Sequence, residues 1–216
     1  MAVIAAKMFL AERNILLYSV PIRQSKRKEA IMRKNFGSKP WLYPQPVAIV
    51  ATYDADGNAD AMNAAWAGTG SMDTVVLDLT HTHKTVANIQ ESGAFTVQIA
   101  DAANVVAADY VGVVSANNQP NKLEKAGWTT TKSEFVNAPV INELALCLEC
   151  EFTGFDEAGH TVGRVVNVSC DEAALDEAGM PDTAKIDAIV YEPITHAYHR
   201  LGEKVGQAFS DGNQLK

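Results

Sequence analysis

Short runs of β-branched and apolar residues, separated by turn signals, recur along most of the chain. Residues 47–53 form such a run, and the sequence Asp54-Ala55-Asp56-Gly57 after it is a strong turn. The chain returns at residues 59–67 and again at 75–79, which predicts an antiparallel meander of three neighbouring strands. Connections this short argue against alternating βαβ units, whose crossovers need a dozen residues or more.

The later part of the chain predicts helices inserted between further strands, and it contains no internal repeat or second-domain linker. The pattern as a whole therefore predicts one mainly β, barrel-like domain with inserted helices. The expected later elements are a strand at 95–99, a helix from Asp101 to Val111, a short helix at 122–126, a hairpin of 144–155 and 161–169, and strands at 186–191 and 195–200.

A strand-to-helix junction over residues 75–89 carries the strongest chemical signal. Val86 and Ile89 suit the apolar side of a helix that Gly93 ends. Free backbone N–H groups, the helix dipole, hydroxyls and an ammonium converge at such a helix start, which favours an anion, most naturally phosphate. The alternative is that Thr80 or Thr82 only caps the helix. The polar residues of the junction are Thr80, His81, Thr82, His83, Lys84 and Thr85.

Two further motifs bear on the ligand. His81 and His83 supply two candidate metal ligands, but no third lies at helical or strand spacing, which favours hydrogen bonding at the phosphate over a metal site. The stretch Asn63-Ala64-Ala65-Trp66 places small residues, which let a flat ligand approach the backbone, beside an indole that can stack on it. Core packing of Trp66 is the alternative. Neither a Rossmann nor a Walker pattern is present, so a nucleotide has to be held in another way.

Charge is distributed unevenly over the 216 residues. Residues 1–39 carry a net charge of +7 and the remainder −15, so the overall charge of −8 argues against a general nucleic-acid binder. The apolar run at 15–20 is too short for a transmembrane helix, and its basic residues follow it, unlike those of a signal peptide. We therefore predict that residues 1–31 are an extension outside a domain of residues 32–216 and that no membrane is involved; a basic amphipathic surface segment is the alternative.

Three cysteines do not suggest a disulfide scaffold. Cys147 and Cys150 lie three residues apart on an expected strand, so their side chains leave opposite faces about 10 Å apart. No second cysteine pair completes a zinc knuckle. Reduced thiols predict a cytoplasmic protein.

Several motifs occur in a specific order over residues 33–210. They are Pro44-x-Pro46-Val47-Ala48-Ile49-Val50, Asn63-Ala64-Ala65-Trp66, His83-Lys84-Thr85 with Asn88-Ile89, Asp109-Tyr110-Val111-Gly112 followed by Ser115 and Lys122-Leu123, Ala138-Pro139-Val140-Ile141 with Leu148-Glu149-Cys150, and Tyr198-His199-Arg200-Leu201-Gly202. In this order and spacing the chain resembles the flavin reductase-like FMN-binding split-barrel family, and most closely its flavoredoxin branch.

The resemblance implies a six-stranded Greek-key split barrel with FMN at its edge, and a homodimer whose second subunit helps to close the site. It places the 5′-phosphate near His83, Lys84 and Thr85. It also implies that His160 corresponds to a histidine often found near the flavin or nicotinamide, in a stretch that is shorter here. The other implied contacts are Asn63, Ala64, Ala65 and Trp66 for the isoalloxazine ring, and Thr80, Ser115 and Lys122 for the ribityl chain or phosphate.

The function that the resemblance implies is an FMN-dependent oxidoreductase, which takes hydride from NADH or NADPH onto the flavin and passes electrons to a small-molecule acceptor or an electron-transfer protein. Bound flavin does the redox chemistry, so no side chain is predicted as catalytic. The rival interpretation is a flavoredoxin-like electron carrier that exchanges electrons with a protein partner and has little NAD(P)H activity. A flavin-free split barrel is the third.

Overall fold

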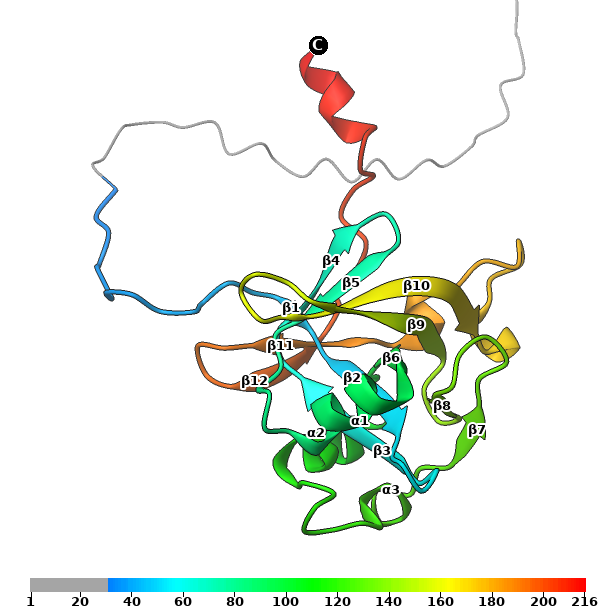
Figure 1. The fold of residues 1–216 in the computed structure, drawn as a ribbon. Coiled ribbons are helices and arrows are strands. Elements are labelled where there is room, and N and C mark those ends of the chain that lie inside the picture. The colour runs from blue at the N-terminus through cyan, green and yellow to red at the C-terminus, as the bar shows by residue number, and fades with distance from the viewer. Residues whose placement is uncertain (1–30) are drawn as a thin grey trace, which may run out of the picture. The chain divides into compact units, whose positions relative to one another are not determined.

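The computed structural model describes residues 31–216, and residues 40–216 form one compact unit (Figure 1). Its centre is an antiparallel sheet of seven strands in the order β3-β2-β6-β9-β10-β5-β4. The strands are β2 (Ala48–Tyr53), β3 (Ala59–Ala64), β4 (Ala67–Ser71), β5 (Thr74–Leu77), β6 (Ala94–Ile99), β9 (Leu146–Phe155) and β10 (Thr161–Cys170).

The two edge strands of this sheet are consecutive in the chain. β3 ends at Ala64 and β4 begins at Ala67, although the sheet order places these strands at opposite edges. Consecutive Cα atoms are 3.8 Å apart, so the two strand ends lie within about 11 Å of each other. The sheet must therefore curl until its edges meet at Ala65 and Trp66, which we call the seam. The predicted mainly β split barrel with inserted helices is confirmed.

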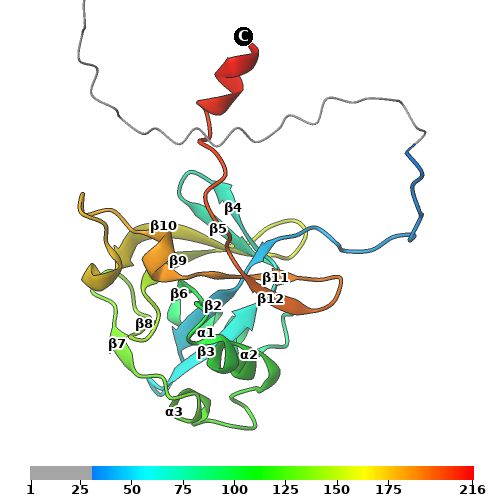
Figure 2. The ribbon, with the colours of Figure 1, turned by 180° about the vertical axis from the view of Figure 1, so that it is seen from behind.

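A smaller sheet lies against one end of the barrel (Figures 1 and 2). It joins β1 (Gln45–Pro46), β11 (Ile189–Glu192) and β12 (Ala197–Arg200) in the order β1-β11-β12. Val47 links it directly to β2, and Ala100 bonds to both Val47 and Ile189. The chain near its C-terminal end is therefore brought beside the first strands. A separate pair is formed by β7 (Thr130–Lys132) and β8 (Pro139–Ile141).

The hydrophobic core has two main clusters, one on each face of β2, and helices pack against both. Ala48 and Val50 face the barrel interior, where Val86 and Ile89 of α1 (Lys84–Ser92) also pack. Ile49 and its neighbours on the other face pack against α2 (Val105–Val113) and α3 (Lys122–Lys125). Both faces of β2 are covered, which explains its nearly continuous apolar sequence. The remaining helices are α4 (Thr183–Ile186) and the short 3₁₀ turns η1 (Glu172–Ala174) and η2 (Asp211–Leu215).

Several predicted elements are confirmed, including the strands at 47–53 and 95–99 and the hairpin of β9 and β10. Gly93 ends α1 in the left-handed conformation, with φ of 71°, as predicted for a residue without Cβ. The strand predicted at 186–191 begins at Ile189 because α4 continues to Ile186, and β12 begins at Ala197.

Three predictions about elements are wrong. Residues 59–67 are not one strand, because the chain crosses the seam at Ala65 and Trp66, and the three-stranded meander is therefore absent among the described strands. The helix predicted from Asp101 begins at Val105 and ends at Val113. Asp101 instead pairs with Ala188 as an isolated β-bridge, and its carboxylate accepts the backbone N–H of Asn104 at 2.8 Å.

The extension predicted at residues 1–31 lies, except for Ile31, outside the described residues, so its boundary stays a prediction. Among residues 31–216, none of the helices has both the length and the apolar character needed to cross a bilayer. Cys147 and Cys150 are buried free thiols, and burial, with the charge of Glu149, raises the pKa of each to about 12. Neither is a thiolate nucleophile at neutral pH.

Candidate functional site

A cavity of about 330 Å³ lies between the start of α1 and the loop after α2; we call it the helix-start cavity. It collects six of the predicted site residues from three separate segments, so the fold brings together what the sequence spreads over 41 positions. They are Thr82, His83, Lys84, Thr85, Ser115 and Lys122. The wall is completed by Asp60 and Met62 of β3, and by Val111 to Val114 and Ala116.

The first turn of α1 presents unpaired backbone donors to this cavity. His83 occupies the N-cap position, and its side chain makes no capping hydrogen bond. The alternative in which Thr80 or Thr82 caps the helix is therefore wrong. The amides of Lys84 and Thr85 meet no acceptor within residues 31–216, as expected for the first N–H groups of a helix without a cap. These donors and the positive end of the helix dipole suit an anion.

Lys84 is the most accessible cation of the cavity. Its side chain is 24% exposed, and Nζ lies 3.1 Å from Oδ2 of Asp54, in the turn after β2. Partial burial raises the pKa of the Asp54 carboxyl, but hydrogen bonds from Asn58 and Lys84 outweigh this effect and lower the pKa below its ordinary value. Asp54 therefore stays ionised at neutral pH and holds the ammonium at the entrance of the cavity.

A buried ion pair lies deeper in the cavity wall. Lys122 Nζ is 2.9 Å from Oδ1 of Asp60, and the two side chains are 3% and 2% exposed. The hydroxyl of Thr85 donates to Oδ2 of the same carboxylate at 2.8 Å. One carboxylate thus joins the start of α1 to the start of α3.

A second cavity of about 300 Å³ adjoins the first, and Gly112 and Val113 line both. It contains Asn63 and Ala65 of the predicted ring-binding stretch, and we call it the tyrosine cavity. A Cβ on Gly112 would lie 2.9 Å from Cβ of Asn63, so α2 can approach β3 this closely only with glycine here. The remaining lining residues are Pro46, Asp109, Tyr191, His196 and Tyr198.

Hydrogen bonds hold the polar groups of the tyrosine cavity. The hydroxyl of Tyr198 donates to Asp109 at 2.9 Å and accepts from the Asn63 amide at 3.4 Å. Burial and this bond to Asp109 raise the pKa of Tyr198 to about 12, so the phenol stays protonated at neutral pH. Tyr191 forms a 2.6 Å hydrogen bond with Nδ1 of His196.

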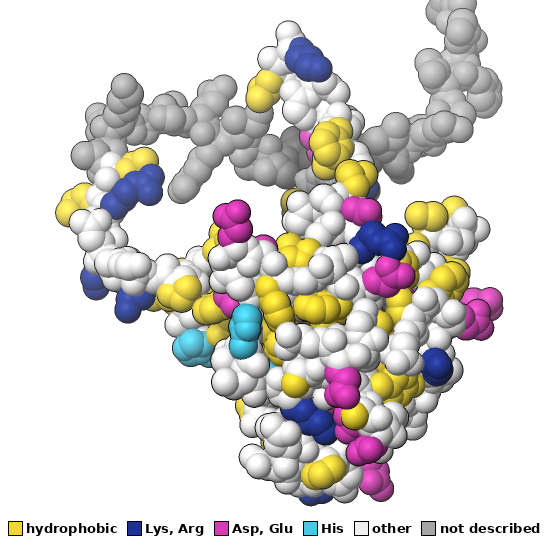
Figure 3. Space-filling model, viewed as in Figure 1, with side chains coloured by type: hydrophobic (Ala, Val, Ile, Leu, Met, Phe, Trp, Pro, Cys, Tyr) yellow, Lys and Arg dark blue, Asp and Glu magenta, His cyan; other side chains and the backbone are white. Residues whose placement is uncertain are grey.

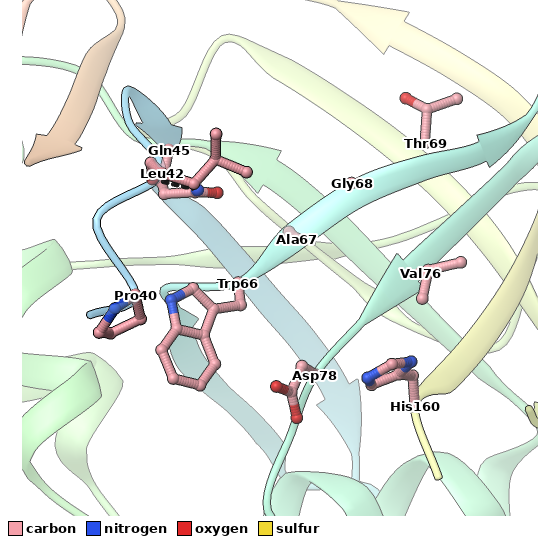
Figure 4. Close-up of a pocket in the computed structure, with 10 residues that line it drawn as sticks. All are labelled: Pro40, Leu42, Gln45, Trp66, Ala67, Gly68, Thr69, Val76, Asp78 and His160. Atoms are coloured by element: carbon pink, nitrogen blue, oxygen red, sulfur yellow. Dashed lines mark hydrogen bonds between the residues drawn. The ribbon is translucent and has the colours of Figure 1, made fainter. Parts of the chain in front are cut away.

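A third cavity, of about 400 Å³, opens on the other side of the seam, and we call it the tryptophan opening (Figure 4). Trp66 forms one wall and is 48% exposed, while Asp78 and His160 lie at the lower margin in the view shown. Nδ1 of His160 is 2.8 Å from the carboxylate of Asp156. The rest of the lining is mostly apolar: Pro40, Leu42, Gln45, Ala67, Gly68, Thr69 and Val76.

Three predicted residues line none of these cavities. Ala64 is 2% exposed and belongs to the barrel core. Thr80 contributes its carbonyl to a turn, where it accepts the N–H of His83. His81 stacks on Phe155 with ring centroids 4.7 Å apart, and its Nε2 is 2.8 Å from the Gly159 carbonyl oxygen. His81 therefore joins the junction to the turn between β9 and β10 and does not line the helix-start cavity, as His83 does.

The sequence interpretation missed Asp60, Asp54, Asp109 and Tyr198 as site residues. One feature of the sequence could have identified Asp60. It is an acidic residue within a predicted strand whose side chains alternate between two faces, and a carboxylate on the buried face needs a partner. Asp109 and Tyr198 belonged to matched motifs, but nothing in their spacing shows that residues 89 positions apart form a hydrogen bond.

Comparison with known proteins agrees with this geometry. Residues 41–199 match the family described as flavin reductase like domain. The chain belongs to this family. A flavin cofactor and an oxidoreductase type of activity are the properties that membership of the flavin reductase like family supports.

Two solved flavoredoxins are similar to this member of the flavin reductase like family over most of its length. The flavoredoxin of Desulfovibrio vulgaris (Miyazaki F) is 34% identical with a TM-score of 0.81, and the match covers 84% of this chain and all of that one. The flavoredoxin from Methanosarcina acetivorans is 25% identical with a TM-score of 0.75, covering 86% of this chain and all of that one.

A curated relative from Aeropyrum pernix is 32% identical over 123 residues. This match covers 55% of the present chain and 45% of the relative, so the chain matches less than half of that protein's length.

Proposed function

We propose that the protein is an FMN-dependent oxidoreductase that binds the flavin phosphate in the helix-start cavity and the ring along the seam. The observation that carries this proposal is the uncapped start of α1, where Lys84 and Thr85 line the cavity and their backbone amides have no hydrogen-bond acceptor within residues 31–216. The adjoining tyrosine cavity extends the space toward Asn63 and Ala65. An anion site continuous with a partly aromatic cavity fits a phosphorylated planar ligand.

Each group of residues has a distinct role in this proposal. The two amides and the ammonium of Lys84 hold the phosphate, with His83, Thr82 and Ser115 around it. Asn63 and Ala65 border the ring, and Trp66 lies beside it across the seam. Bound FMN supplies the hydride and electron transfer, while the protein supplies position and electrostatics.

The electron donor that we propose is NADH or NADPH, entering through the tryptophan opening. Its support is the half-exposed indole of Trp66 next to the seam, which offers a planar partner a surface to stack on. The same opening favours a second candidate, an electron carrier with a protein partner, because Leu42 is 78% exposed beside Trp66. Figure 3 shows apolar side chains gathered on one face, with histidines near them.

Anaerobic reduction tests the proposal and separates the two candidates. The purified protein is loaded with FMN, mixed rapidly with NADH or NADPH, and followed at the visible flavin band. Slow bleaching by either nucleotide is the expected result for the oxidoreductase. Bleaching by dithionite alone selects the carrier, and no flavin band after loading rejects flavin binding altogether.

We also propose a homodimer in the cytoplasm. Three free cysteines support a reducing compartment. Support for the dimer is the exposed apolar surface of α2, where Val106 and Val113 are 79% and 73% exposed and which a two-fold related copy can cover while the tryptophan opening stays free. Sedimentation should give about twice 23.2 kDa; a monomer that still binds FMN tightly would contradict a shared site.

A further inference from the structure

The buried pair of Asp60 and Lys122 joins the two walls of the helix-start cavity. Asp60 accepts the hydroxyl of Thr85 from the wall formed by α1. Lys122 donates to the carbonyl oxygens of Val114 and Val111, at 3.1 and 3.4 Å, on the wall formed by the end of α2. The 2.9 Å contact between Asp60 and Lys122 connects these two sets of bonds.

The polar groups of this network interact mainly with one another. Lys122 Nζ donates hydrogen bonds to the carbonyl oxygens of Val114 and Val111. Its charge is paired with Oδ1 of Asp60 at 2.9 Å, although this oxygen accepts no hydrogen bond within residues 31–216. A hydroxyl has one proton, and that of Thr85 goes to Asp60. The hydroxyl of Thr85 therefore has no proton left for a phosphate, and the charge of Lys122 is already compensated by Asp60, although both residues line the cavity.

The pair is also placed favourably with respect to the two helices. The Asp60 carboxylate lies at the start of α1, where the helix dipole is positive. The Lys122 ammonium lies at the final carbonyls of α2, where the dipole is negative. Since both charges are nearly fully buried, each depends on the other for neutralisation.

We propose that Asp60 and Lys122 are positioning residues that set the distance between the α1 and α2 walls for the flavin phosphate, without contacting it themselves. The phosphate is then held by the Lys84 and Thr85 amides and by Lys84. This inference rests on the proposed function, because it assigns the pair a role toward the phosphate of FMN. It revises the direct phosphate or ribityl contact that the resemblance implied for Lys122.

Comparing FMN with riboflavin tests the inference, because riboflavin lacks the phosphate. The useful variant is the double substitution Asp60→Asn with Lys122→Met, which removes both buried charges and keeps an acceptor for Thr85. We expect FMN affinity to fall by about 10- to 100-fold, the loss that is typical when residues that orient the ligands of a metal ion are removed. Riboflavin affinity and the melting temperature should change little. Flavin fluorescence titration gives both affinities.

Control variants separate positioning from folding. Lys122→Met alone leaves Asp60 buried without a counter-ion and should lower the melting temperature, whereas the double variant should restore it. The exposed pair Arg164 and Glu151 is the matched control, and its double variant Arg164→Met with Glu151→Gln should keep both ligand affinities.

Each outcome decides between the hypotheses. Equal FMN affinity in wild type and in the folded double variant overturns the positioning role but leaves the proposed function standing. Parallel losses for FMN and riboflavin overturn it as well, since they show a general collapse of the cavity. A wild-type protein that binds neither flavin rejects the proposed function and this inference together.

Thr85 gives an independent measurement on the same network. Thr85→Ser keeps the hydroxyl that donates to Asp60 and should retain FMN affinity, while Thr85→Val should lower it and leave riboflavin unaffected. If Thr85→Val binds FMN like the wild type, the bond to Asp60 has no positioning role.

Discussion

The helix-start cavity and the tryptophan opening lie on the same barrel but are built from opposite kinds of surface. The first is walled by charged groups that already have partners, and its ion pair of Asp60 and Lys122 is at most 3% exposed. The second is mostly apolar, with Trp66 at 48% and Leu42 at 78% exposure. One region is fixed by hydrogen bonds before a ligand arrives, whereas the other leaves large side chains without cover.

This difference suggests that the two regions recognise different features of their ligands. Directional bonds at the helix start select one chemical group, because a misplaced or missing phosphate leaves buried donors unpaired. Stacking on an open indole tolerates many planar molecules. We therefore expect the protein to bind the flavin with high specificity and to accept a range of molecules that exchange electrons with it.

The largest expected effect comes from removing the ammonium of Lys84, the accessible cation of the helix-start cavity. Lys84→Ala should weaken FMN binding by about 10- to 150-fold, because a hydrogen bond to a charged group contributes roughly 1.5–3 kcal/mol. Riboflavin affinity and the fold should be unchanged, and titration of both ligands checks this. Lys132→Ala, at an exposed lysine of β7, is the control. FMN affinity equal to that of the wild type would remove Lys84 from the phosphate site.

A smaller effect, and a different pattern, is expected at the tryptophan opening. Trp66→Ala should weaken FMN and riboflavin alike by about 2- to 12-fold, since aromatic stacking contributes about 0.5–1.5 kcal/mol beyond burial. Met72→Ala, at a fully exposed side chain in the turn between β4 and β5, is the control. A loss confined to FMN would show that the two regions are not separable as described.

The tyrosine cavity lies next to the helix-start cavity and gives a test by pH. In the unfolded chain Tyr198 titrates near its ordinary pKa of 10.0, whereas in the folded protein burial and Asp109 raise the pKa to about 12. The stability from this difference is fully present below about pH 10 and is lost as the pH rises through about 12. Thermal unfolding across this range should show a smaller loss for Tyr198→Phe than for the wild type, with Tyr43→Phe as the control. Identical curves would contradict the assignment.

The smallest effect is expected from shortening the chain. A chain that starts at Met32 should fold, dimerise and bind FMN as the full chain does, because both cavities and the opening are built from residues 40–198. Flavin titration and sedimentation of the shortened protein check this. Insolubility or loss of flavin would make residues 1–31 part of the structure.

Sequence reasoning succeeded where the signal was local. The start of α1 follows from a strand, a polar turn and an apolar period within 15 residues, and the Gly93 stop follows from its missing Cβ. Turn chemistry likewise located the β9 and β10 hairpin. These features depend on neighbours in the chain, which a single sequence displays directly.

Sequence reasoning failed where the structure depends on contacts between segments that are far apart in the chain. The meander over residues 47–79 was wrong because β3 and β4 pair at opposite edges of the sheet, which no local pattern encodes. Lys122 lines the same cavity as Lys84, but its ion pair with Asp60 depends on three elements that meet only in the fold. Hydrogen bonds such as that of Tyr198 with Asp109 follow from topology, and topology was supplied here by the family resemblance.

The seam at Ala65 and Trp66 has a consequence for how the protein matures. The cavities beside it need β3, β4 and the segments that pack on them, so none is complete until the two edges of the sheet have met. In the site that we propose, a flavin therefore recognises only chains that have finished closing, and its binding shifts the folding equilibrium by mass action. At 100 times its dissociation constant a ligand adds about 2.7 kcal/mol of stability. The concentration of flavin in the cell should accordingly influence the steady-state amount of this protein. Cells with little flavin should contain more unfolded chains, which proteases degrade.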